Sequence, residues 1–129
     1  MEKVAIMTIQ EIATRYHAMA QTGQYAQIQD ALYAPDCVSV ESENYSDLPI
    51  KVIGLAAMRQ KEGHFFHQVE VMHGGYCHEP MICGSFFTCA QGMDVTMRGQ
   101  QRKEKDQLAV VEVVNGKIVL EHFFYADTQ

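Results

Sequence analysis

Cysteine and histidine are the metal ligands most readily recognised in a sequence, and this chain has four cysteines and six histidines. The cysteines are Cys37, Cys77, Cys83 and Cys89, and no two of them form a CxxC pair. Structural zinc sites use closely paired ligands, so this spacing argues against zinc. His64 and His67 lie one turn apart on a predicted helix, but no third ligand follows at a known motif spacing. We therefore expect no metal site, and free thiols rather than disulfides.

Asp94 is an acidic residue in an otherwise apolar stretch that is predicted to form a strand. Met93 and Val95 flank it, and strands disfavour aspartate. A salt bridge to Arg98 or Arg102 would explain its position. A carboxylate that lines a ligand pocket would also explain it. The sequence leaves both interpretations open, so Asp94 is kept as a candidate ligand-binding residue.

The length and composition of the chain are those of one acidic globular domain, residues 1–129. Of its 129 residues, 47% are hydrophobic and 20% are charged, which excludes wholesale disorder. A chain of this size forms one hydrophobic core. The formal net charge of -6 argues against a nucleic-acid-binding protein, because such proteins need a basic face for the phosphates.

Several targeting and cofactor signals are missing from the sequence. No apolar run approaches the roughly 18–20 residues of a membrane-spanning helix, and the first residues lack the long apolar stretch of a signal peptide. There is no GxGxxG or GxxxxGK[ST] phosphate-binding loop. We therefore expect a cytoplasmic protein with no membrane partner, no nucleic-acid partner and no cofactor.

Three helices are predicted in the first half of the chain. They run from Thr8 to Gly23, from about Gln24 to Pro35, and from about Leu55 to Phe66. Thr8 and Glu11 have the spacing of a capping box, in which each side chain binds a free backbone N–H of the first turn. Gly23 is suited to end the first helix, and Pro35 is expected to end the second.

Strands are predicted for most of the remaining chain. They cover Val38–Ser42 and residues of about 69–77, 81–97, 102–114 and 117–126, with a loop at Glu43–Gly54. Gly74-Gly75 is suited to a bulge in the second of these strands. Asn115-Gly116 predicts a two-residue type I′ hairpin, which needs a positive φ at both positions. Helices followed by mostly antiparallel strands indicate an α+β fold.

Five short segments carry a resemblance to a known family: Leu32–Asp36, Val38–Glu41, Gly54–Ala57, Asn115–Ile118 and Phe123–Tyr125. Their order and spacing resemble the SnoaL-like branch of the nuclear transport factor 2-like superfamily, which also contains ketosteroid isomerase. The resemblance implies three helices packed in the concave face of a strongly curved, mostly antiparallel sheet. It also implies an apolar pocket for a small ligand, and a homodimer formed through the outer face of the sheet.

The resemblance also suggests catalytic residues. Glu41 falls where ketosteroid isomerase-like proteins carry the carboxylate that moves a proton next to a carbonyl. Tyr16 falls where they carry the hydroxyl that stabilises the enolate oxygen. Their second oxyanion donor corresponds to Leu108, and the catalytic residue of SnoaL cyclases falls on Phe123. Neither side chain does acid–base chemistry, so neither reaction carries over intact.

The faces of the last hairpin decide which further residues line the pocket. Pairing Val114 with Lys117 and extending this pairing gives two faces. One face contains Leu108, Val110, Glu112, Val119, Glu121, Phe123 and Tyr125; the other contains Ala109, Val111, Val113, Ile118, Leu120, His122 and Phe124. Alternation slightly favours the second face as core because it has fewer charges. The resemblance favours the first, because pocket residues of relatives fall on Glu121, Phe123 and Tyr125.

We take the first face, which adds Leu108 and Val110 to the candidate ligand-binding residues. Glu121 would then be a carboxylate in a largely apolar cavity, where desolvation raises its pKa and suits it to proton transfer. Phe66 and Phe87 are expected in the core and, by association, in the pocket wall.

Three functions remain open at this point. The first is an enzyme that acts without a cofactor on a small apolar carbonyl compound, as an isomerase, cyclase or dehydratase. Glu41 would be its base, Tyr16 its hydrogen-bond donor, and Glu121 or Asp94 a second acid. The second is a non-catalytic binder of a small apolar ligand. The third is a dimeric interaction module whose pocket is filled by its own side chains.

Overall fold

A computed structural model describes residues 6–42 and 48–126 of the chain. Within these residues lie the helices α1 (Ile9–Gln21), α2 (Tyr25–Leu32) and α3 (Leu55–His67). The strands are β1 (Tyr33–Glu41), β2 (Lys51–Ile53), β3 (Val69–Cys77), β4 (Met81–Cys83), β5 (Phe86–Met97), β6 (Arg102–Val114) and β7 (Lys117–Tyr125). None of the described helices is long and apolar enough to cross a membrane.

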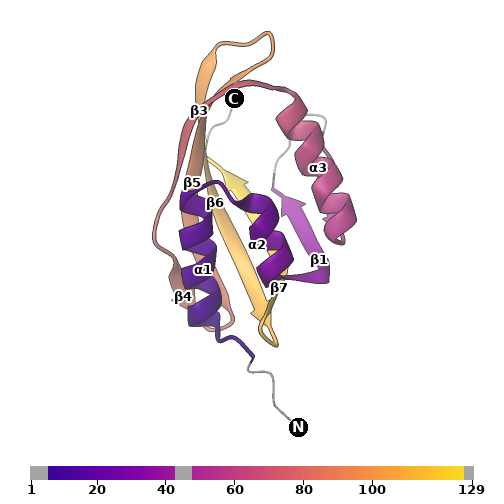
Figure 1. Ribbon diagram of the computed structural model, residues 1–129, viewed down its shortest axis with the longest axis vertical. Helices are drawn as coiled ribbons and strands as arrows, with labels where there is room; N and C mark the ends of the chain where they lie inside the picture. Colours follow the sequence, from indigo (N-terminus) through magenta and orange to yellow (C-terminus); the bar gives the residue numbers. More distant parts are fainter. Residues whose placement is uncertain (1–5, 43–47, 127–129) are drawn as a thin grey trace.

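The strands form one curled, open sheet against which the three helices pack (Figure 1). The strand order is β2-β1-β7-β6-β5-β3. The short strand β4 pairs with a different part of β5 from β3. The β1–β7 pair is parallel and the other pairs are antiparallel. This arrangement confirms the expected α+β fold class.

The ends of α1 follow from the local sequence. The Thr8 hydroxyl accepts a hydrogen bond from the Glu11 N–H at 3.2 Å, and the Glu11 carboxylate accepts one from the Thr8 N–H at 3.1 Å. The predicted capping box is therefore confirmed. Gly23, just past the helix, has a φ of 70°, which glycine adopts without strain.

The junction of α2 and β1 differs from the expectation. The helix ends at Leu32, and β1 begins at Tyr33 with Pro35 inside it. The pairing of β1 with β7 is irregular between Tyr33 and Val38. Proline lacks an N–H and is tolerated in strands at such irregular positions. The prediction that Pro35 ends the helix was therefore wrong.

The later strands match the predictions with two changes. The register of β3 and β5 shifts between Met72 and Gly74, where the bulge was expected. The single strand predicted for 81–97 is divided into β4 and β5, with Gly84 between them at a φ of 61°. The predicted loop Glu43–Gly54 contains β2, and its residues 43–47 lie outside the described residues.

The last hairpin contains a bulge that the sequence analysis did not include. Asn115 and Gly116 have φ values of 49° and 73°, as the predicted turn requires. Val113 pairs with Ile118, but the next residue of β6, Glu112, pairs with Leu120, so one residue of β7 is extra. This extra residue reverses the alternation of the hairpin beyond it.

The bulge changes which residues of β6 share a face with the pocket residues of β7. Glu121 pairs with Val111, Phe123 with Ala109, and Tyr125 with Gln107. Leu108 and Val110 pair with Phe124 and His122 on the opposite face. The prediction that Leu108 and Val110 share a face with Glu121, Phe123 and Tyr125 was therefore wrong.

The hydrophobic core lies between the three helices and the end of the sheet near the hairpin turn. Its largest fully buried side chains are Ile12, Leu32, Met58, Phe87 and Ile118. The rings of Tyr16 and Phe87 meet edge to face, with centroids 5.3 Å apart. The same strands continue past this core to the residues that surround a cavity.

Candidate functional site

The helices and the sheet enclose a cavity of about 500 Å³, within the range of small-molecule sites. Residues from all three helices and from β1, β5, β6 and β7 line it. Its ionisable lining residues are Tyr16, Tyr25, Tyr33, Glu41, Lys61, Glu62, Lys103, Lys105, Glu121 and Tyr125. No group of three or more His, Cys, Asp or Glu side chains in the described parts of the chain could hold a metal ion.

A buried ion pair joins α3 to β1. The Lys61 ammonium donates to the Glu41 carboxylate at 3.0 Å, and both side chains are buried. The Tyr125 hydroxyl donates to the other oxygen of Glu41, and the Phe123 ring centroid lies 6.0 Å from Lys61 Nζ. Burying two charges is costly unless their remaining hydrogen bonds are made. Here the tyrosine and the ion pair occupy both oxygens of Glu41.

Glu121 is a second buried carboxyl group beside this ion pair. One oxygen accepts a hydrogen bond from the Tyr33 hydroxyl, and the other accepts one from Ser39 Oγ at 2.6 Å. Ser39 Oγ in turn accepts one from Lys61 Nζ at 2.8 Å, so the lysine reaches Glu121 only through the serine.

Burial raises the pKa of Glu121, and the charge of Glu41 adds to this effect. Hydrogen bonds from Ser39 and Tyr33 oppose it, as does the charge of Lys61. Within the hydrogen-bonded group of Glu41, Glu121 and Lys61, the one ammonium balances one carboxylate, so this group is neutral when Glu121 holds a proton. Glu121 is therefore suited to holding and releasing a proton.

Tyr16 places a phenol hydroxyl in the cavity wall from α1. Its oxygen accepts a hydrogen bond from Gln91 Nε2 at 3.1 Å. Gln91 Oε1 in turn accepts one from Gln107 Nε2 at 3.3 Å. Among the described residues, no acceptor binds the phenol proton of Tyr16. Burial raises the pKa of Tyr16 well above its ordinary value, and the charge of Glu121 raises it further. The phenol therefore stays neutral and can donate to a ligand.

Glu62 lines the cavity from α3. It accepts a hydrogen bond from the Gln29 amide, whose oxygen accepts one from Arg59 Nε at 3.2 Å. Burial, followed by the charge of Glu121, raises the pKa of Glu62 to about 7. Two carboxyl groups in one cavity disfavour each other's ionised form.

The structure brings together most of the side chains proposed from sequence. Those that line the cavity are Tyr16, Glu41, Phe66, Glu121, Phe123 and Tyr125. Phe87 lies in the core against Tyr16. Leu108 and Val110 lie outside the lining, because the hairpin bulge turns them to the opposite face.

Asp94 is also outside the cavity lining. Its two carboxylate oxygens accept hydrogen bonds from Arg102 at 2.9 and 2.7 Å. These bonds lower the pKa of Asp94. The salt bridge, and not the pocket carboxylate, is therefore the interpretation of Asp94 that the structure supports.

Sequence reasoning missed several residues of the site. Lys61 lies one turn after the buried Met58, so a charged residue on an apolar helix face was a usable signal. Ser39 precedes Glu41 by two residues in β1 and therefore shares its face. No local signal points to Tyr33 or Gln91, because their partners are far away in the sequence.

The order and geometry of these elements agree with the comparison of the sequence with protein families. The sequence profile of the SnoaL-like domain matches residues 7–125. The chain belongs to this SnoaL-like family. The resemblance found in the sequence is thereby confirmed.

Solved structures show the same fold as this SnoaL-like chain. A proposed SnoaL-like polyketide cyclase from Mesorhizobium loti is 29% identical, with 92% of this chain and 100% of that one covered and a TM-score of 0.82. A protein of unknown function with a cystatin-like fold from Xanthomonas campestris is 19% identical (94% and 92% covered, TM-score 0.77). TerC, co-crystallised with polyporic acid, is 18% identical (92% and 90% covered, TM-score 0.73). No curated protein matches the sequence significantly.

Proposed function

We propose that this SnoaL-like protein binds a small, largely apolar carbonyl compound and moves a proton at the carbon next to the carbonyl. The observation that carries the proposal is that Glu121 and Tyr16 line one cavity with complementary properties. Glu121 is a carboxyl group whose raised pKa makes it a stronger base when ionised. Tyr16 is a neutral phenol with a proton to donate.

The two groups together support enolisation. Glu121 removes a proton from the carbon, the C–H electron pair forms a carbon–carbon double bond, and the carbonyl electrons move to oxygen. Tyr16 donates a hydrogen bond to this oxygen as its negative charge develops. Return of the proton from Glu121 to the same or another carbon gives exchange or isomerisation.

The Glu41–Lys61 pair has a supporting role in this proposal. The resemblance assigns the base to Glu41, but the arrangement favours Glu121. Glu41 is bound directly to a cation, whereas Glu121 accepts hydrogen bonds only from neutral hydroxyls. Lys61, acting through Ser39, stabilises Glu121 when it is ionised.

Deuterium exchange tests the proposal without knowledge of the natural substrate. The protein is incubated with 2-tetralone or 1-indanone in D₂O, and loss of the proton next to the carbonyl is followed by NMR. We expect exchange faster than in buffer. Glu121→Gln should abolish the acceleration, and Tyr16→Phe should slow it by about a hundredfold, as for removal of one oxyanion donor.

Two variants outside the cavity are matched controls for this assay. Glu112→Gln changes a carboxyl group that does not line the cavity, and Tyr76→Phe removes a phenol hydroxyl that binds Asp106. Both should exchange as the wild type does. Exchange at the buffer rate with every ketone would reject proton transfer as the function.

Binding without turnover is a second candidate function. All four oxygens of Glu41 and Glu121 already accept hydrogen bonds from protein side chains, so the carboxyl groups could serve only to shape the pocket. In that case the ketones, or polyporic acid, would raise the melting temperature while the exchange rate stayed at that of buffer.

We also propose that the protein forms a homodimer through the outer face of its sheet. Leu108 and Phe124 pair across β6 and β7 on this face and are 40% and 42% exposed. His122 stacks on Phe124 with ring centroids 4.2 Å apart. An apolar strip of this kind on a sheet face marks an interaction surface.

A further inference from the structure

A second, more open hollow adjoins the cavity. It has a volume of about 860 Å³ and lies between the turn joining α1 to α2, helix α3 and strand β3 (Figure 1). We call it the outer groove and define it by Tyr25, Gly63, Phe66, Met72 and Gly74, which all line it. It is not part of the proton-transfer site described above.

The outer groove is continuous with the cavity. Tyr25, Gln29, Glu62, Phe66 and Met93 line both hollows. The hydrogen bond from Gln29 to Glu62 therefore lies where the two meet. A molecule longer than the cavity would extend into the groove at this point.

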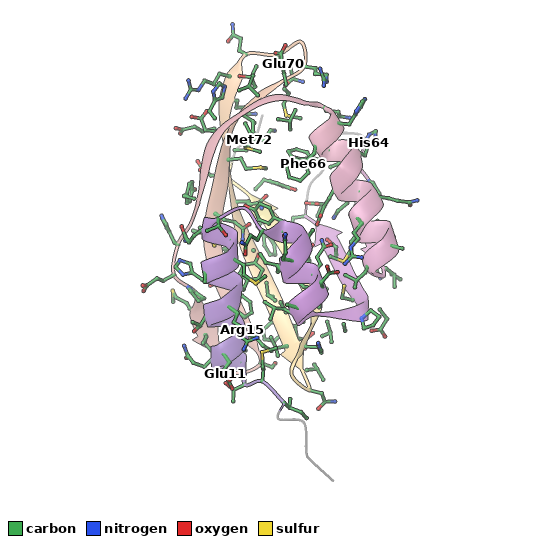
Figure 2. All side chains as sticks on the ribbon, in the orientation of Figure 1. Glu11, Arg15, His64, Phe66, Glu70 and Met72 are labelled. Carbon is green, nitrogen blue, oxygen red and sulfur yellow. The ribbon has the colours of Figure 1, made fainter. Side chains whose placement is uncertain are left out.

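The groove presents apolar side chains that the protein itself leaves uncovered. Tyr25, Phe66 and Met72 are 37%, 42% and 44% exposed. Figure 2 shows Phe66 on α3 and Met72 on the facing strand β3. Exposed apolar side chains that lie together are typical of binding grooves, and here polar residues such as Arg59 and Glu70 also line the groove.

Two glycines keep the groove open. A Cβ atom at Gly63 or Gly74 would meet no other heavy atom within 4 Å. Neither glycine has a positive φ, so the backbone there accepts other residues. Both glycines line the groove, so a larger side chain at either position would start in open space beside it.

We propose that the outer groove binds the distal, apolar part of an elongated substrate whose carbonyl end lies at Tyr16 and Glu121. This inference rests on the proposed function, and it narrows the substrate class to molecules with a further ring or an acyl chain beyond the ring system that carries the carbonyl. A single ring system would occupy the cavity alone.

The test uses two phenols, because a phenol has the planar geometry and acidic oxygen of an enol. The probes are 2-naphthol and 6-phenyl-2-naphthol, and their dissociation constants are measured by isothermal titration calorimetry. We expect the wild type to bind the longer probe at least about tenfold more tightly, since its extra ring is buried in the groove.

Gly63→Leu and Gly74→Leu fill the groove. Each should weaken binding of 6-phenyl-2-naphthol by about tenfold and leave that of 2-naphthol unchanged. Gln60→Leu adds the same side chain to an exposed position of α3 outside both hollows, and it should change neither affinity. Circular dichroism melting checks folding, and if one glycine variant does not fold, the other decides the test.

Equal affinities of the two probes for the wild type would overturn the inference and leave the proposed function standing. The inference would also be overturned, with the proposed function still standing, if the leucine variants reduced the affinity for both probes equally or for neither. Failure of the wild type to bind either phenol would instead reject the proposed function, and the inference with it.

Discussion

At the scale of single residues, one hydrogen-bonded group in the cavity wall joins two carboxyl groups to one cation. Glu41 and Glu121 share one cation, Lys61, and hydroxyl groups from Tyr33, Ser39 and Tyr125 complete their hydrogen bonds. Four hydrogen bonds satisfy the four oxygens of the two carboxyl groups, but Glu121 keeps a raised pKa. The raised pKa of Glu121 is therefore caused by its buried surroundings.

Removing the cation should reveal the cost of burying Glu41. Lys61→Met leaves this carboxylate without its ion-pair partner, and we expect it to lower the free energy of unfolding by about 3–5 kcal/mol. The double variant Lys61→Met/Glu41→Gln should recover most of that loss, because no unpaired charge remains. Urea unfolding measures both. Wild-type stability of the single variant would show that the pair is not buried as described.

Glu62 should make stability depend on pH. Because its pKa is raised from 4.5 to about 7 in the folded protein, folding is favoured by the proton. The free energy of unfolding therefore falls as pH rises from about 4.5 to 7 and is constant above that. Glu62→Gln should remove this loss, so it should raise the free energy of unfolding at pH 8 by about 1–2 kcal/mol after allowance for solvent screening.

Urea unfolding at pH 5 and pH 8 measures this effect. The gain of Glu62→Gln over the wild type should be small at pH 5 and fully developed at pH 8. Glu104→Gln on β6 lies outside both hollows and should show no such difference. An identical pH dependence in wild type and Glu62→Gln would contradict the pKa assignment.

At the scale of elements, local patterns set the ends of helices and turns, whereas long-range pairing set the faces of strands. The capping box at Thr8 and the hairpin turn at Asn115 involve neighbours in the sequence, and both were predicted. The bulge after Val113 and the continuation of β1 through Pro35 depend on pairing with another strand. Neither feature has a local signal in the sequence.

The cap of α1 gives a prediction at this scale, since α1 carries Tyr16 into the cavity. Thr8→Ala removes the acceptor for the Glu11 N–H and should lower the free energy of unfolding by about 1 kcal/mol. Thr14→Ala, in the exposed middle of the same helix, should have no destabilising effect. Thermal or urea unfolding compares them, and equal stabilities of the two variants would contradict the capping role.

At the scale of the whole molecule, the curled sheet has two uses. Its concave side holds the core near the hairpin turn and the cavity further along the same strands. Its outer side exposes the strip around Leu108 and Phe124. The proposed ligand site and the proposed dimer surface are therefore on opposite faces of one sheet.

The proposed dimer can be tested by light scattering coupled to size-exclusion chromatography. We expect a mass twice that of the 14.6 kDa chain. Phe124→Glu places a charge in the strip and should give a monomer that still binds 2-naphthol. Lys117→Glu, near the hairpin turn, should remain dimeric. A monomeric wild type would reject the dimer without affecting the cavity.

The sequence by itself determined the α+β class, the order of the three helices and the main strands, the N-cap of α1 and the hairpin turn, because these follow from neighbouring residues and their periodicity. The family followed from the resemblance of five short segments. It also placed Tyr16, Glu41 and Glu121 among the candidates through the resemblance. Only the tertiary structure decided their surroundings. The hydrogen bonds of Glu121 come from residues 88 and 82 positions away, and Lys61 reaches Glu41 across 20 positions. Such contacts depend on the packing of separate elements, so burial, charge balance and pKa were set by the fold.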